Sequence, residues 1–447
     1  MKEDYRQVAY DILNNFDAEE MNLSELLERN LGRTEESGRC RDSVCGIVRN
    51  TIAIDMLISQ IGSTPIENIN SMLINILRIG VYELLYSESD AEYAAVNEAV
   101  KLAAKSAGTR GSGFVNAILR NVVRSVTDFD SLDFASNVLP IDTQQCCQFD
   151  RPLFADFDKK PINYLRAVFS LPDWLVEGWN EEYGLDKTVE ICLASNRKPS
   201  LYVKANTLKV SNQELLELFE KDGVEFEFLG GYEIFRIAQG QMIRKLPGFK
   251  EGYFWVQDIT ASQVASKIIS RNDMSVLDLC SAPGSKTVEM ARVSGGKADI
   301  LATDINRSRL VRVRENCERL GISNVKIVNY NSIIAESKFD AVLLDVPCSN
   351  TGVLAKRHEV RYNISHESVS SLVEMQREIM DYAKGFVEAG GKIIYSTCSL
   401  EAAENRLQIE GFLKDNPDFK LEFEKQTLPS ANIVDFDGGY LAILTRK

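Results

Sequence analysis

The chain has 447 residues, of which 45% are hydrophobic and 26% charged, and its formal net charge is −14. This composition is typical of a folded globular protein, and the length suggests about two to four domains. The acidic total excludes a protein that coats nucleic acid indiscriminately, although it leaves room for a local basic cleft.

The N-terminal residues and the cysteine and histidine content indicate the cellular setting. Met1-Lys2-Glu3-Asp4-Tyr5 carries charges where a signal peptide has an apolar run, and no apolar stretch reaches the roughly 18 residues of a membrane span. We therefore expect a cytoplasmic protein with no membrane partner. Nine cysteines without a secretory signal favour reduced thiols over disulfides. With only two histidines, His358 and His366, we expect no metal site, and we expect both at the surface or in loops.

Residues 1–126 predict an all-helical domain. Apolar residues recur at helical spacing, as in Tyr5, Val8, Ile12 and Leu13. Residues 101–127 contain no acidic residue. The basic residues of that stretch are Lys101, Lys105, Arg110, Arg120 and Arg124. We weigh an ordinary solvated helix face equally against an edge that contacts RNA phosphates.

Two shorter regions follow the helical domain. Residues 127–162 are polar and contain three prolines, and we expect a linker there. Its pair Cys146-Cys147 lacks a second pair at ligand spacing, which argues against zinc. Residues 163–250 predict a small α+β domain that binds RNA as RRM domains do. Its Tyr202 and Lys204 could stack on bases or bind the RNA backbone, although core packing is at least as consistent with the pattern.

Residues 251–447 alternate between short apolar strands and helices. Strands are expected at 276–280, 300–303, 325–328, 341–344, 392–395 and 440–445, and helices at 286–294, 306–320, 368–389 and 403–415. This order predicts an α/β fold with a doubly wound, mainly parallel, Rossmann-like sheet. Ligands of such sheets bind at the carboxyl ends of the strands.

A tight turn follows the first of these strands. It reads Cys280-Ser281-Ala282-Pro283-Gly284-Ser285-Lys286-Thr287, and a helix is expected to begin within it. The spacing is not that of a phosphate-binding Walker loop. Asp304 ends the next strand, where an acid commonly binds ribose hydroxyls. The pattern indicates a cofactor that contains a nucleoside; an arbitrary turn with a surface acid is the alternative.

Two cysteines occupy equivalent places after later strands. Asp345-Val346-Pro347-Cys348-Ser349 follows one strand, and Tyr395-Ser396-Thr397-Cys398-Ser399 follows another. A single cysteine is more often structural than reactive. Two cysteines at the sheet edge that holds the cofactor turn are harder to explain as structural residues. A thiol with a lowered pKa is a good nucleophile near neutral pH, so a catalytic role is the alternative.

These stretches carry a resemblance to a known family. LDLCSAPGSKT, DVPCSNTG and STCS, in this order, resemble the RNA cytosine-5 methyltransferases that use S-adenosylmethionine. Over essentially its whole length the chain resembles the RsmB (Sun/Fmu) type of bacterial ribosomal RNA methyltransferases, which carry an N-terminal NusB-like domain. Further matches are FVNAILR at 114–120, KAN at 204–206 and the stretch from Tyr395 to Asn405.

The resemblance implies an activity and its partners. The expected reaction is methylation of C5 of a cytidine in 16S ribosomal RNA, either naked or in a partly assembled small subunit. We expect a monomer that does not act on DNA. Cytosine C5 is a poor nucleophile, and addition of a thiolate at C6 activates it, which requires a base that is flipped out or single-stranded.

The resemblance also implies roles for individual residues. Cys398 would add to C6 of the base, Asp345 would contact the base edge, and Cys348 would help to remove the C5 proton. The expected cofactor-binding residues are Cys280, Ser281, Ala282, Pro283, Gly284, Ser285, Lys286, Asp304, Asn331 and Asp345. The expected RNA-binding residues are Lys101, Lys105, Arg110, Arg120, Lys204, Asn206, Lys356 and Arg357. In related DNA enzymes the Pro-Cys thiol attacks, so the sequence alone leaves the nucleophile open, and we favour Cys398.

Some positions depart from the family pattern. Asn331 stands where the family usually has an Asp that contacts adenine, and Ala355-Lys356-Arg357-His358-Glu359 replaces an Arg-Arg-x-Pro-Asp run. None of the departures removes a catalytic group. Two alternatives stay open: a non-catalytic RNA-binding or ribosome assembly factor with a degenerate methyltransferase fold, and a transfer RNA cytosine-5 methyltransferase.

Overall fold

The computed structural model describes residues 2–18, 21–87, 92–334 and 336–447. The chain divides into two compact units. Unit 1 consists of Met1–Lys198, Leu354–Asn363 and Ala431–Ile433; unit 2 consists of Pro199–Val353, Ile364–Ser430 and Val434–Lys447. Across the described residues, no single helix has the length and apolar character to cross a membrane, although the bent pair Ser37–Arg49 and Thr51–Gly62 passes that test by length and composition alone.

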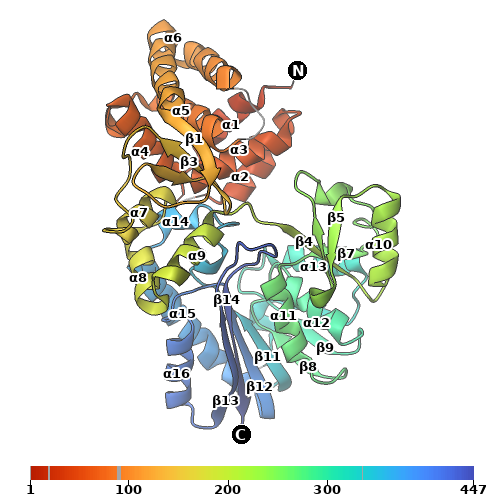
Figure 1. Ribbon diagram of the computed structural model, residues 1–447. Helices are drawn as coiled ribbons and strands as arrows, with labels where there is room; N and C mark the ends of the chain where they lie inside the picture. Colours follow the sequence, from red (N-terminus) through yellow and green to blue (C-terminus); the bar gives the residue numbers. More distant parts are fainter. Residues whose placement is uncertain (1, 19–20, 88–91, 335) are drawn as a thin grey trace. The chain divides into compact units, whose positions relative to one another are not determined.

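Unit 1 begins with the helical domain that the sequence predicts. Its helices are α1 (Tyr5–Asn15), α2 (Leu23–Asn30), α3 (Ser37–Arg49), α4 (Thr51–Gly62), α5 (Ser71–Leu85) and α6 (Glu92–Ser125) (Figure 1). Gly108 has a φ of +68° and kinks α6 in its middle. Helices α5 and α6 pack closely because Gly80 has no side chain: a Cβ there would lie 2.6 Å from Leu119.

The first part of the region expected to be a linker, 127–162, is ordered and forms a sheet. Strands β1 (Val126–Ser131), β2 (Val138–Pro140) and β3 (Gln145–Phe149) are ordered β1-β3-β2 and antiparallel. Cys146 and Cys147 are buried on the central strand. The sequence pattern hid this sheet because β1 is mostly exposed and carries polar residues on both faces.

The predicted small domain over 163–250 is divided between the two units. Helices α7 (Pro161–Val168), α8 (Asp173–Tyr183) and α9 (Leu185–Asn196) belong to unit 1. The remainder belongs to unit 2 and forms a four-stranded antiparallel sheet in the order β5-β6-β4-β7. Its elements are β4 (Leu201–Ala205), α10 (Asn212–Lys221), β5 (Phe226–Leu229), β6 (Ile234–Ile237) and β7 (Phe254–Val256). Phenylalanines, among them Phe219, Phe235 and Phe254, fill the core of this sheet.

The second piece of unit 1 comes from a distant part of the sequence. Leu354–Asn363, which includes the short helix α14 (Val360–Asn363), packs among the N-terminal helices. Of the two settings expected for His358, the surface or a loop, the structure shows the loop: the residue lies in a turn and its side chain is buried. Burial, together with the nearby Arg49 and Arg361, lowers the pKa of His358 well below its ordinary value, so the imidazole is neutral.

Unit 2 contains the doubly wound sheet that the sequence predicts. Its seven strands are ordered β10-β9-β8-β11-β12-β14-β13. The strands are β8 (Ser275–Asp278), β9 (Asp299–Ala302), β10 (Val325–Ile327), β11 (Phe339–Asp345), β12 (Val387–Thr397), β13 (Phe419–Thr427) and β14 (Gly439–Arg446). The first five run parallel, and β14 and β13 add an antiparallel edge.

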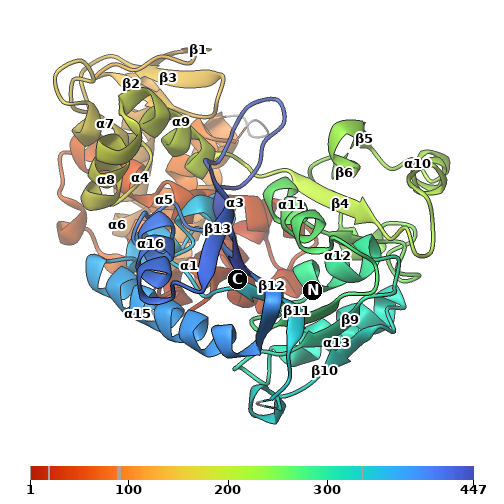
Figure 2. The same ribbon diagram turned by 90° about the horizontal axis from the view of Figure 1, so that it is seen from below.

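Helices cover both faces of this sheet (Figures 1 and 2). Helices α11 (Ile259–Ile268), α12 (Ser285–Val293) and α13 (Leu310–Leu320) bury one set of strand residues, such as Val276 and Leu343. Helices α15 (His366–Ala383) and α16 (Arg406–Asp415) bury the alternate set, such as Leu277 and Leu344. Burial of neighbouring strand residues on opposite faces explains the continuous apolar runs in the sequence.

Candidate active site

The turn after β8 has the geometry expected of a ligand-binding loop. β8 ends at Asp278 and α12 begins at Ser285, so the turn ends at a helix N-terminus. Gly284 has a φ of +104°, and a Cβ there would lie 3.3 Å from Val313, so both backbone and packing require glycine. Asp304 accepts hydrogen bonds from the backbone N–H of Ala282 (3.3 Å) and of Asn306 (2.8 Å), and so holds the turn against the end of β9.

Three buried polar atoms beside this turn have no hydrogen-bond partner in the described part of the chain. They are Oδ1 of Asp278, Oγ of Ser281 and Oγ1 of Thr303. They lie close together, because the Ser281 N–H donates to the Thr303 carbonyl (2.9 Å) and the Thr303 N–H donates to the Asp278 carbonyl (2.9 Å). Buried polar atoms are normally paired, so this cluster fits a polar ligand that completes it.

The carboxyl of Asp278 titrates near neutral pH. Burial raises the pKa of its carboxyl to about 7, against a hydrogen bond of 2.6 Å from the Thr287 hydroxyl that favours the anion. Asp345, Lys286 and Asp304 also face this carboxyl.

The raised pKa predicts a pH dependence of stability. The unfolded carboxyl ionises near pH 4 and the folded one near 7, so its stabilising contribution is full below about pH 4 and is lost as the pH rises through 7. We expect the free energy of unfolding to fall by up to about 4 kcal/mol across this range relative to Asp278→Asn, measured by urea denaturation. The exposed Asp299→Asn is the control and should keep the wild-type slope. A wild-type profile parallel to that of Asp278→Asn would contradict the prediction.

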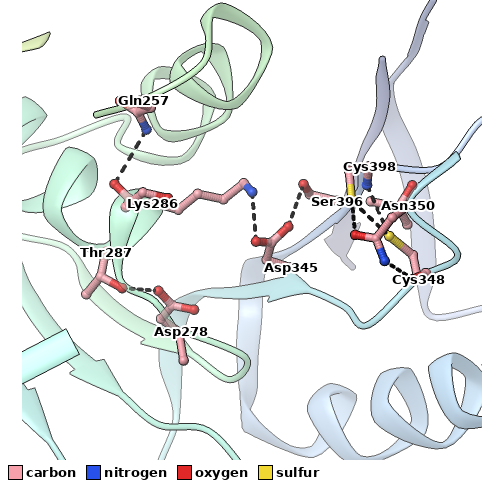
Figure 3. A network of polar contacts seen from close by, with 12 residues as sticks. Gln257, Asp278, Lys286, Thr287, Asp345, Cys348, Asn350, Ser396 and Cys398 are labelled. Carbon is pink, nitrogen blue, oxygen red and sulfur yellow. Dashed lines mark hydrogen bonds and ion pairs between the residues drawn. The ribbon is translucent and has the colours of Figure 1, made fainter. Parts of the chain in front are cut away.

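An ion pair joins the turn to the neighbouring strand. Lys286 Nζ lies 2.7 Å from Asp345 Oδ2, and the Ser396 hydroxyl donates to Asp345 Oδ1 at 3.2 Å (Figure 3). Burial alone would lower the pKa of Lys286, but the Asp345 carboxylate outweighs it and raises that pKa, so the lysine is cationic. The pair places a carboxylate and an ammonium beside the cysteine-bearing strand ends.

The two cysteines of the sequence analysis meet at this edge of the sheet. Because β11 and β12 are adjacent and parallel, with Asp345 opposite Ser396, the loops that follow them run side by side. Cys348 Sγ lies 3.2 Å from Cys398 Sγ, and the Cys398 N–H donates to Cys348 Sγ at 3.3 Å. The Cys398 thiol also contacts Asn350 Oδ1 at 3.1 Å (Figure 3). Asn350 adopts a left-handed conformation, with a φ of +63°.

The surroundings distinguish the two thiols. Cys348 is buried, and its hydrogen bond with Cys398, followed by burial, raises its pKa well above the ordinary value. Cys398 is half-buried and lines a cavity of about 90 Å³ together with Lys286, Ser396, Thr260 and Lys425. The sulfur of Cys398 is therefore the one presented to an incoming molecule.

The structure places the expected RNA-binding residues in different settings. Lys101, Lys105, Arg110 and Arg120 are exposed on α6. In the segment Leu354–Asn363, Arg357 is exposed and Lys356 is half-buried. Lys204 and Asn206 are not available to RNA. Lys204 is buried in an ion pair with Glu289 (2.8 Å), and the Asn206 amide donates to the carbonyls of Gly252 and Leu320. The role seen for these two is to attach the four-stranded sheet to α12 and α13.

Other expected and unexpected residues complete the site. Asn331 is exposed in the turn Tyr330–Ser332 that follows β10. Cys280 lies in the turn, where burial raises its pKa. Glu404, which bridges the two cysteine loops, was not singled out from the sequence; its position six residues after Cys398 in STCSLEAAEN was the available signal. Over the described ranges, no group of three or more potential ligands could hold a metal ion.

Comparisons with known proteins identify the families that the parts of this chain match. A family model described as 16S rRNA methyltransferase RsmB/F matches residues 267–439, a NusB family model matches 3–124, and an RsmF/B-like ferredoxin-like domain model matches 171–233. A probable ribosomal RNA small subunit methyltransferase B of Synechocystis is 31% identical and covers 98% of this chain and 95% of its own. The ribosomal RNA small subunit methyltransferase B of Proteus mirabilis is 29% identical over 90% of this chain and 88% of its own.

Solved structures support the fold. The crystal structure of PH0851 superposes with a TM-score of 0.73 and 21% identity, and covers 99% of both chains. NSun6 from Pyrococcus horikoshii, solved with SFG, gives a TM-score of 0.54 and 21% identity over 62% of this chain and 98% of its own.

Proposed function

The chain belongs to the 16S rRNA methyltransferase RsmB/F family, and we propose that it transfers a methyl group from S-adenosylmethionine to C5 of a cytidine in small-subunit ribosomal RNA. The observation that carries the proposal is the meeting of two thiols and the Lys286–Asp345 pair at one strand edge. Methylation at an exocyclic nitrogen or a ribose oxygen has no use for a thiol nucleophile, whereas C5 of a pyrimidine needs one.

The geometry supports different tasks for the two cysteines. Cys398 faces the cavity, so its thiolate would add to C6 of the base and make C5 nucleophilic. Cys348 lies 3.2 Å from it, and its raised pKa keeps it protonated while Cys398 attacks. We assign to Cys348 the later step: once it has lost its proton to water, its thiolate would accept the C5 hydrogen while the C6–S bond breaks and Cys398 leaves as a thiolate. Asp345, held by Lys286, would contact the N3/N4 edge of the base.

The turn after β8 supports S-adenosylmethionine as the cofactor, which would supply the methyl group. Residues 280–286 would hold its methionine part, and the unpaired atoms of Asp278, Ser281 and Thr303 fit a ligand rich in donors and acceptors. Asp304 would bind the ribose and Asn331 the adenine, and the asparagine brings an acceptor without charge. The SFG in the structure of NSun6 is an analogue of S-adenosylmethionine, which is consistent with this use of the fold.

The RNA contacts of this proposal come from unit 1. Lys101, Lys105, Arg110 and Arg120 on α6, with Lys356 and Arg357, would bind phosphates of the ribosomal RNA. We propose that the protein acts as a monomer on naked RNA or on a partly assembled subunit.

Transfer of tritium from labelled S-adenosylmethionine to RNA tests the function. We expect label in 16S ribosomal RNA from cells that lack the protein, none in transfer RNA, and a single new protected cytosine on bisulfite sequencing. Label in transfer RNA alone would assign the other substrate. Cofactor binding without transfer to any RNA would indicate a non-catalytic assembly factor.

A further inference from the structure

Glu404 is a fully buried carboxylate that lies between the two cysteine loops. Its Oε1 accepts hydrogen bonds from the Ser349 N–H (2.9 Å) and from the Gln376 amide (2.9 Å). Its Oε2 accepts from the Ser399 hydroxyl (2.5 Å) and from the Ser349 hydroxyl. Both oxygens are therefore occupied by donors from the protein.

The donors are the immediate neighbours of the reactive cysteines. Ser349 follows Cys348, and Ser399 follows Cys398. The Gln376 amide also donates to the carbonyl of Pro347, the residue before Cys348 (2.9 Å). The hydroxyl oxygens of Ser349 and Ser399 lie 3.0 Å apart, so the two cysteine loops meet at the Glu404 carboxylate.

The charge of Glu404 has no cationic partner among the described residues. Its contacts are neutral donors, and the groups that titrate beside it are Cys348 and Tyr395. Burial of an anion that has only hydrogen-bond partners costs free energy, so such a group is retained where the surrounding residues are fixed in place to donate to it. Its negative charge also disfavours a thiolate at Cys348.

We propose that Glu404 is a positioning residue for the methyl transfer, which ties the Cys348 loop to the Cys398 loop and directs attack on the base to Cys398. The direction of attack to Cys398 rests on the proposed function, whereas the tie between the two loops concerns only the two thiols. Removal of the bridge should free the Cys348 loop without touching the base, the methyl donor or the reacting sulfur.

The substitution Glu404→Gln tests the bridge, because glutamine keeps the shape and turns one acceptor into a donor that faces other donors. Iodoacetamide labelling of the native protein, read by peptide mass spectrometry, should mark Cys398 in the wild type and spare the buried Cys348. In Glu404→Gln, we expect the ratio of Cys348 labelling to Cys398 labelling to rise by about tenfold or more. The reason is that loss of one buried hydrogen bond makes local opening of the Cys348 loop more frequent. Glu410→Gln, the same change on the exposed face of α16, is the matched control and should label as wild type.

Kinetics provide the second measurement. Glu404→Gln should lower kcat by about tenfold or more and leave the KM for RNA within about twofold, because RNA contacts are untouched. Ser399→Ala, which removes one donor and no charge, should show a smaller change in the same direction and serves if Glu404→Gln does not fold. A labelling ratio and a kcat equal to those of the wild type would overturn the proposal.

The labelling needs neither RNA nor methyl donor, so the two proposals fail in different ways. An unchanged labelling ratio overturns the bridge even in an active enzyme. An increased ratio in a protein that methylates no RNA supports the bridge and overturns the proposed function.

Discussion

Alanine in place of Cys398 is expected to lower kcat for RNA methylation by about 10,000-fold or more, the size of loss seen when a covalent nucleophile is removed. The reason is that C5 of cytosine becomes nucleophilic only while sulfur is bonded to C6, and Cys398 is the thiol that faces the cavity. Transfer of tritium to 16S ribosomal RNA measures the rate. Binding of S-adenosylmethionine, measured by calorimetry, should be unchanged, because the turn of residues 280–286 is intact.

Alanine in place of Cys348 should have the opposite effect on the covalent complex. Attack by Cys398 survives, but proton removal and release fail, so an RNA–protein adduct should accumulate and appear as a shifted band on a denaturing gel. The half-buried Cys45 of α3 provides the control, since Cys45→Ala should neither slow the enzyme nor trap RNA. An adduct in Cys398→Ala and none in Cys348→Ala would reverse the two roles.

The elements that carry the chemistry were predictable because their signals are local. The apolar runs before Asp278, Asp345 and Ser396 are strands buried on both faces, and the structure confirms them as β8, β11 and β12. Parallel neighbours bring their ends to one edge, so the meeting of Cys348 and Cys398 follows from sequence order and the fold class. The distance of 3.2 Å between the two sulfurs, and the contact of Cys398 with Asn350, cannot be predicted from local sequence pattern.

Other elements were missed because their pattern is weak. β13 is largely exposed, and its apolar alternation is limited to Phe419, Leu421 and Phe423, which is a short signal. The helix expected over 368–389 ends at Ala383, and β12 begins at Val387, since the Gly390-Gly391 pair lies within a strand rather than a turn. In the sequence, Lys204 has the pattern of an exposed cation, and only the fold shows that it is buried in an ion pair with Glu289.

The place of the segment Leu354–Asn363 in unit 1 is the largest feature of the fold that could not be predicted from the sequence. In the sequence, a run of charged residues after a cysteine loop is typical of a solvated surface. The structure corrects this: the Arg361 side chain is buried in unit 1, and burial lowers its pKa to about 10. Its guanidinium donates to the carbonyls of Arg49 (2.7 Å), Phe169 (3.0 Å) and Ser195 (3.0 Å) and to Oδ1 of Asn196 (2.8 Å).

Arg361→Ala should therefore destabilise unit 1 by about 3 kcal/mol or more, because it leaves buried acceptors unpaired and opens a cavity. Hydrogen exchange read by mass spectrometry measures this locally, and we expect loss of protection in peptides from α3 and α9, whose ends hold Arg49 and Asn196. Arg357→Ala in the same segment removes an exposed cation that lies 3.6 Å from Glu359, and should change stability by less than about 0.5 kcal/mol. Equal protection in the two variants would show that the buried guanidinium does not hold the segment in unit 1.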